Sequence, residues 1–90
     1  MVDKEKLLET IKRIENSPEA KDMRERLLDI AKRIGEVEEG AKMDELVDDT
    51  ERTRRVIQKN RSLNALYGLH IKTLLEEVEF KRTGKHIVID

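Results

Sequence analysis

The side chains best placed to do chemistry are two asparagines in the second half of the chain and the basic residues near them. Asn60 and Asn64 lie four positions apart, so a helix would carry both amides on one face, with Arg61 beside them. If this helix packs against the segment that contains Arg24, the two amides and two guanidinium groups border a small polar pocket that could hold an anion. On an apolar seam, the same asparagines would instead fix the register and oligomeric state of a helical bundle, which is the role we expect.

A basic run in the middle of the chain could contact nucleic-acid phosphates. Its members are Arg52, Arg54, Arg55, Lys59 and Arg61, and no acidic residue separates them. However, the run has no interleaved aromatic residue on which a base could stack, and the acidic stretch 36–51 before it would repel a duplex. We therefore expect these charges to pair between helices, with Arg33 to Asp49 as the intramolecular pair that the register favours. Nucleic-acid binding is the alternative function.

The remaining reactive side chains lack the neighbours that catalysis or metal binding requires. Acidic pairs such as Asp44 and Asp48 lie at i,i+4, but no calcium-loop pattern and no glutamate-histidine motif accompanies them. His70 and His86 have no catalytic partner within helical reach. The chain has no cysteine, which excludes disulfides, thiolate metal sites and a cysteine nucleophile. We expect no metal and no cofactor.

One short segment invites comparison with an enzyme family. The residues from Asp49 to Arg52, Asp-Thr-Glu-Arg, resemble the Asp-x-x-Arg-Glu segment of the all-helical chorismate mutases, which are small helical homodimers. Membership would imply an active site at these residues. The pattern departs at Thr53, where the family has a glutamate, and the family's preceding arginine and lysine and its C-terminal glutamine have no counterpart. We therefore expect no enzyme activity. Among the alternative functions, a chorismate-mutase-like enzyme or a small-anion-binding protein is less favoured than nucleic-acid binding.

The composition is typical of long helices. Charged residues make up 43% of the 90 residues and aromatic residues 2%, while the apolar residues recur at spacings of three and four, which argues against disorder. A chain of this length forms one domain, which we place at residues 1–83. It buries only roughly 60–65% of its unfolded surface, so a thin core and self-association are expected.

Three helices are predicted, at about residues 3–15, 18–39 and 43–82. Ser17 and Pro18 end the first and start the second, because proline disfavours a helical residue before it but suits the first helical position. In the second, Leu28 and Ala31 widen the apolar seam. Across residues 39–42 the apolar positions shift by two residues, which would rotate the apolar face by about 200° on a continuous helix. We therefore expect the chain to turn there. The third seam runs without a break to Val78, which predicts one helix roughly 60 Å long.

These elements predict an all-α fold, a long antiparallel helical hairpin in which the two shorter helices pack along the third. A compact three-helix bundle with an overhanging third helix is the alternative. Near its C-terminal end, the third helix is apolar on more faces than one partner helix covers. The expected interface comprises Leu63, Leu66, Tyr67, Leu69, His70, Ile71, Leu74 and Leu75. We therefore expect a homo-oligomer, preferably a helical-bundle homodimer, that acts as a non-enzymatic protein-protein interaction or assembly module.

Residues 84–90 are expected to form a C-terminal tail. Gly84 is a suitable helix stop, and the β-branched residues that follow His86 are typical of a strand. The first residues show no apolar signal-peptide core, and no stretch approaches the roughly 18 apolar residues of a membrane span, so a cytoplasmic protein is expected. The net charge of −1 gives no general attraction to nucleic acid or anionic membranes. The dense Glu, Lys and Arg content also fits a thermophilic source.

Overall fold

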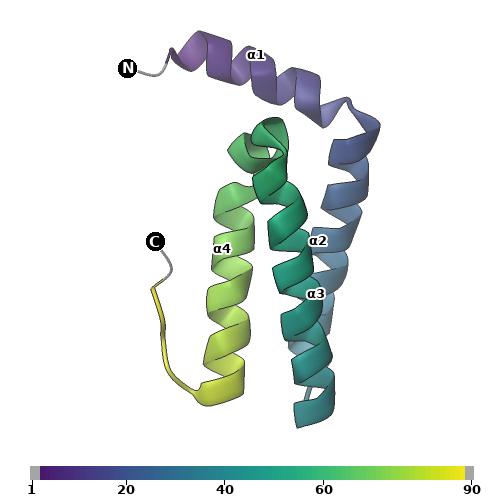
Figure 1. Ribbon diagram of the computed structural model, residues 1–90, viewed down its shortest axis with the longest axis vertical. Coiled ribbons are helices and arrows are strands. Elements are labelled where there is room, and N and C mark those ends of the chain that lie inside the picture. The colour runs from purple at the N-terminus through teal and green to yellow at the C-terminus, as the bar shows by residue number, and fades with distance from the viewer. Residues whose placement is uncertain (1–2, 89–90) are drawn as a thin grey trace.

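A computed structural model of the chain describes residues 3–88, without the side chain of Leu7. These residues form four helices and no strand: α1 (Lys4–Glu15), α2 (Pro18–Glu36), α3 (Gly40–Lys59) and α4 (Arg61–Thr83). Figure 1 shows α2, α3 and α4 side by side, each antiparallel to the next, with α1 lying across the end at which α3 meets α4. The predicted all-α class is confirmed.

The first two helices begin at residues whose side chains cap them. The Asp3 carboxylate accepts a hydrogen bond from the Glu5 N–H at 3.0 Å. The Ser17 hydroxyl accepts one from the Ala20 N–H at 3.2 Å, and Pro18 is the first residue of α2, where the N–H that proline lacks has no helical partner. The chain therefore changes direction between α1 and α2 at a break that is encoded locally.

The predicted single helix over residues 43–82 is wrong, because the chain breaks at Asn60. The backbone of Asn60 is extended, with φ −108° and ψ 106°. Its side-chain oxygen accepts hydrogen bonds from the N–H groups of Ser62 and Leu63, at 3.0 and 3.1 Å, and so caps α4. An asparagine side chain that bonds to nearby backbone N–H groups competes with continuation of the helix.

This break lets α4 fold back on α3, and these two helices form the most extensively packed pair. The molecule measures 43 × 28 × 20 Å, so a straight helix of roughly 60 Å has no place in it. The predicted turn before α3 is present but lies earlier than expected, at residues 37–39 instead of 39–42, because α2 ends at Glu36 and Gly40 is the first residue of α3. The fold is thus closer to the alternative three-helix bundle, with α1 added across one end (Figure 1).

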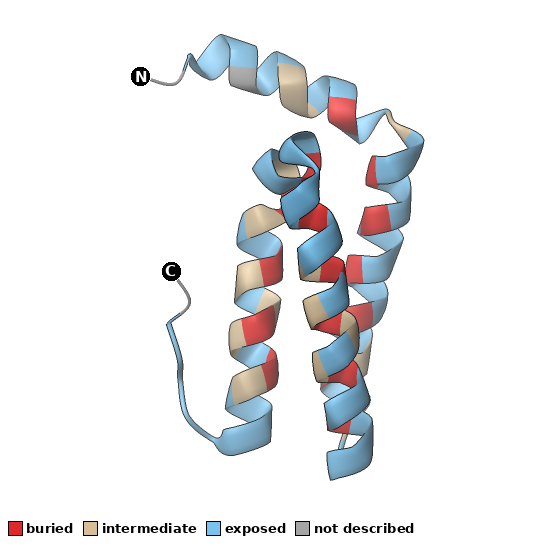
Figure 2. Cartoon of the chain, in the orientation of Figure 1, coloured by how far each residue is buried: buried red, intermediate tan, exposed pale blue. Residues whose placement is uncertain are grey.

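The core follows the inner faces of all four helices, as Figure 2 shows. The part nearer α1 consists of Ile14, Ala20, Met23, Leu27, Ile57, Leu63, Tyr67, Ile71 and Leu75. The part nearer the α2–α3 turn consists of Ile30, Ile34, Met43, Leu46 and Val78. Thr50 and Thr53 are also buried, and their hydroxyls donate to the carbonyl oxygens of Leu46 and Asp49, so both polar groups are satisfied.

The tail leaves α4 at Gly84, whose φ of 73° lies in the left-handed region that suits glycine at a helix C-terminus. It then runs back alongside α4 (Figure 1), and the His86 ring stacks on Phe80 with their centroids 4.1 Å apart. Residues 85–88 have no regular secondary structure, and the rest of the predicted strand lies outside the described residues. Within residues 3–88, no helix combines the length and apolar character needed to cross a membrane.

Candidate protein-interaction surface

The three packed helices leave three grooves that differ in chemistry. The α2/α3 groove is lined mainly by charged residues, and the α3/α4 groove by a mixture of polar and apolar ones. The α2/α4 groove is mostly apolar and has a volume of about 450 Å³, compared with about 160 and 230 Å³ for the others. The candidate residues from the sequence lie in these grooves, in the core or on the outer surface.

The α2/α3 groove contains the expected ion pair. The Arg33 guanidinium donates to the Asp49 carboxylate with Nη1 2.7 Å from Oδ2, and Nη1 also lies 3.6 Å from a carboxylate oxygen of Asp29. The hydrogen bond with Asp49 raises the pKa of Arg33 above its ordinary value, so the guanidinium stays charged. The prediction of an Arg33–Asp49 pair is confirmed. Both side chains remain partly exposed, which limits what the pair contributes to stability to about 1 kcal/mol or less.

The basic run does not form one continuous strip. Arg52 lines the α2/α3 groove, whereas Arg54 lines the α3/α4 groove and lies 3.5 Å from Glu51. The other members, Arg55, Lys59 and Arg61, are exposed. A phosphate backbone that follows a single path would therefore meet only part of the run at once.

The predicted polar pocket around the two asparagines does not form. Asn60 is occupied in capping α4, and Asn64 is exposed at the edge of the α3/α4 groove. Arg24 lines a different groove, the one between α2 and α4, and Arg61 is exposed. The prediction that both asparagines lie on the packed apolar seam is also wrong, because both are exposed and the buried positions of α4 nearest to them are Leu63 and Tyr67.

The two asparagines provide a matched test of this cap. Replacing Asn60 with alanine is expected to lower the free energy of unfolding by about 1 kcal/mol, because two N–H groups at the start of α4 lose their acceptor. Replacing Asn64 with alanine is expected to leave stability unchanged or slightly higher, because alanine is the better residue inside a helix. Chemical denaturation followed by circular dichroism measures both. Equal losses for the two variants would contradict the capping role.

The predicted interface on α4 is divided between the core and the surface. Leu63, Tyr67, Ile71 and Leu75 are buried within the chain, and Leu66 and Leu74 are half-buried. Only Leu69, which is 76% exposed, and His70 lie on the surface. The reason is again the break at Asn60, which places α4 against α1, α2 and α3 instead of a single partner helix. The excess of apolar residues on α4 is thus largely covered by the chain itself.

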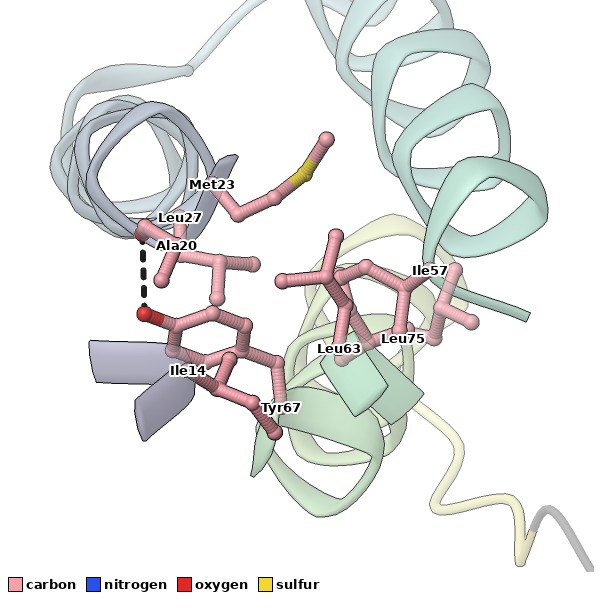
Figure 3. Packing of buried hydrophobic residues seen from close by; sticks show 9 residues of the cluster. Ile14, Ala20, Met23, Leu27, Ile57, Leu63, Tyr67 and Leu75 are labelled. Atoms are coloured by element: carbon pink, nitrogen blue, oxygen red, sulfur yellow. Dashed lines mark hydrogen bonds between the residues drawn. The ribbon is translucent and has the colours of Figure 1, made fainter. Parts of the chain in front are cut away.

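Tyr67 connects α4 to the start of α2. Its hydroxyl donates a buried hydrogen bond to the backbone carbonyl oxygen of Ala20, at 2.9 Å. Figure 3 shows the ring lying among Ile14, Leu27 and Leu63, with the hydroxyl pointing to Ala20. Because the bond ends in the core, Tyr67 acts as an internal anchor between the two helices and not as an exposed interface residue.

The α2/α4 groove is where apolar side chains remain open to solvent. It is lined by Arg24, Leu27, Leu28, Ala31, Tyr67, Leu69, His70, Thr73 and Leu74. Leu28 on α2 is 64% exposed and Leu69 on α4 is 76% exposed, so each wall carries a largely unburied leucine. Sequence reasoning found the α4 wall, but it took Leu28 and Ala31 only as widening the apolar seam of the second helix. The sequence did place both residues to one side of the seam, which was the signal that they could face a groove.

A further hollow of about 450 Å³ lies where the α2–α3 turn meets the end of α4, and it is lined mainly by polar and charged residues, among them Glu38, Asp44 and Arg82. Among residues 3–88, excluding the Leu7 side chain, no group of three His, Cys, Asp or Glu residues is placed to hold a metal ion. Comparisons with protein-family models, with curated proteins and with solved structures gave no match to this chain. Its function is therefore inferred from its geometry and chemistry.

Proposed function

We propose that the protein is a non-enzymatic assembly module that forms a homodimer through its α2/α4 groove. The observation that carries this proposal is the apolar groove itself, which has an exposed leucine on each wall. Two neighbouring helices that expose an apolar groove need further helices to complete a bundle, and a second copy supplies two of them. The same patch can serve on both copies, because a two-fold interface is self-complementary.

The energetics support association of moderate strength. Burying an exposed leucine contributes about 1.5 to 3 kcal/mol, and a two-fold dimer buries Leu28 and Leu69 from both copies. Association also has a cost of roughly 4 to 15 kcal/mol in lost translational and rotational freedom. Four leucines together with the groove residues around them can offset that cost, whereas a single isolated leucine on a surface could not.

The test is the oligomeric state of the wild-type protein and of groove variants. Sedimentation velocity across the micromolar range is expected to show a dimer for the wild type. Replacing Leu28 or Leu69 with glutamate is expected to weaken the dimer at least tenfold, because each copy would place a charge in an apolar interface. The helical content of these variants should not change, since both leucines are largely exposed.

Leu8 offers the matched control. It is 58% exposed, similar to Leu28, but it lies on α1 and does not line the groove. Leu8→Glu is therefore expected to keep the wild-type dimer. A wild-type monomer at high micromolar concentration with an intact helical melt would refute the proposal, and so would equal weakening by all three variants.

A further inference from the structure

We propose that the α3/α4 groove is a second binding site, which takes a small organic carboxylate with its charged group between Arg54 and Lys72 and its apolar part on the floor of the groove. Both cationic residues line the groove, and all of its lining residues come from α3 and α4. It shares no lining residue with the α2/α4 groove, so this site does not depend on the proposed dimer.

The floor of the α3/α4 groove is apolar, and the groove is small. Ile57 on α3 and Ile71 on α4 line it and are only 1% and 3% exposed, so they close it from below. Its volume of about 230 Å³ is below the roughly 300 to 1,000 Å³ of sites for drug-sized molecules. A ligand that fits is therefore small, and part of it is apolar.

Two cations stand on opposite walls of this groove. Arg54 on α3 and Lys72 on α4 are both half-buried. Further along the same pair of helices, Arg82 on α4 reaches Asp44 on α3, with Nε 3.8 Å from Oδ1. Equal numbers of residues from this ion pair lead to about the same level on two antiparallel helices, and ten residues toward Asn60 on each helix are Arg54 and Lys72. One ligand can therefore meet both charges.

No acidic residue balances the two cations on the side toward the end at which α3 meets α4 (Figure 1). Residues 52–75 include six lysine and arginine residues and no aspartate or glutamate. Glu51 lies beyond Arg54, on the other side, at 3.5 Å from its Nη1, which leaves the remaining N–H groups of the guanidinium for a ligand. The Lys72 ammonium has no hydrogen-bond or ion-pair partner within residues 3–88. The site thus attracts an anion.

Gly68 gives the ligand space between the cations and Asn64. A glycine inside a helix lowers its stability relative to alanine, so its presence needs a reason. Its φ is not positive, and no atom of another helix in the described chain lies within 4 Å of the point that a Cβ would occupy. Only the Asn64 side chain comes close, with Oδ1 2.6 Å from that point. Neither backbone geometry nor helix packing requires this glycine, and what it provides is room in the groove.

Two side-chain amides complete the site. Gln58 and Asn64 line the groove beyond Gly68, both are exposed, and within residues 3–88 neither amide has a hydrogen-bond partner. A carboxylate has two acceptor oxygens, one for each cationic wall, and further lone pairs for amide N–H groups. Its apolar part would cover the isoleucine floor, which an inorganic anion could not do.

Titration of the nitrogen-15-labelled wild-type protein with benzoate and with hexanoate, followed by NMR, tests the site. Saturable shifts are expected for the backbone amides of the α3/α4 groove, with dissociation constants in the millimolar range or lower. Benzamide has the shape of benzoate without the charge, and inorganic phosphate has charge without an apolar part. Each is expected to bind at least about tenfold more weakly than benzoate. No saturable shift with either carboxylate, or equal binding of phosphate, would overturn the proposal.

Gly68→Ala separates binding from folding. It is expected to weaken benzoate binding about fivefold or more, because the added methyl group takes space from the ligand and displaces the Asn64 amide. The melting temperature should not fall, since Asn64 is exposed and can rotate away and alanine is the better residue inside a helix. A stable alanine variant that binds benzoate as the wild type does would contradict the site.

Charge variants identify the cations that matter. Arg54→Gln and Lys72→Gln are each expected to weaken benzoate binding about tenfold, because each removes a charged hydrogen-bond donor. The matched control is Arg55→Gln, which removes the neighbouring arginine, an exposed residue that does not line the groove. It should change binding by less than about twofold. Equal weakening by the two arginine variants would mean that anions are attracted only by the general positive charge of residues 52–75, and the proposed site would be wrong.

Discussion

Leu46→Ala is expected to lower the free energy of unfolding by about 3 kcal/mol, within the range of about 2 to 5 kcal/mol observed for buried leucines. Leu46 is fully buried on α3, in the part of the core that also contains Ile34 and Val78. Truncation removes apolar contacts and leaves a cavity that three helices would have to shift to fill. Urea denaturation followed by circular dichroism measures the loss, with the slope of the transition unchanged.

The control for this variant is Leu8→Ala. Leu8 is 58% exposed, so its truncation removes little buried surface and should change stability by less than about 0.5 kcal/mol. Similar losses at the two positions would contradict the placement of Leu46 at the centre of the α2, α3 and α4 packing. A domain of this size has only about 5 to 13 kcal/mol of stability, so the expected loss is a substantial share of it.

The all-α class and the first residues of the first two helices could be predicted, because the local sequence determines them. Ser17 and Pro18 combine a capping hydroxyl with a residue suited to the first helical position, and no tertiary contact is needed to choose that break. The turn before Gly40 was visible as a change in the phase of the apolar seam, since two helices that meet at a turn need not share one phase.

The break at Asn60 could not be found in the same way. The spacing of apolar residues continues in phase from α3 into α4, so the pattern is compatible with one helix or with two helices that fold back on each other. The choice depends on whether the Asn60 side chain caps α4 and on how much apolar surface the fold-back buries. The apolar surface that the fold-back buries is the larger of these two contributions, and it involves residues far apart in the sequence.

The same limit applies to the candidate surface. Periodicity identified α4 as too apolar for one partner, and this directed attention to Leu69 and His70, which do line the groove. It could not show that Tyr67 would be used inside the chain, because that depends on α1 and α2 packing over it. Nor could it identify Leu28 as the opposite wall, since a groove is defined by two helices and their relative rotation.

Tyr67→Ala is expected to cost about 4 kcal/mol of unfolding free energy, the largest effect of any single truncation considered, because a buried aromatic ring is removed from the junction of α1, α2 and α4. Tyr67→Phe separates the hydroxyl from the ring. It is expected to cost about 1 to 2 kcal/mol, since the buried carbonyl oxygen of Ala20 loses the hydroxyl donor while the ring contacts remain.

The difference between these two variants identifies what holds α4 to α2. If the hydrogen bond to Ala20 only satisfies a polar group that the ring brings into the core, Tyr67→Phe should remain far more stable than Tyr67→Ala. Both should be measured at low protein concentration, because Tyr67 also lines the groove and association would add to the apparent stability. A phenylalanine variant as stable as the wild type would show that the hydroxyl contributes nothing net. One as unstable as the alanine variant would place the main contribution in the hydrogen bond and not in the packing of the ring.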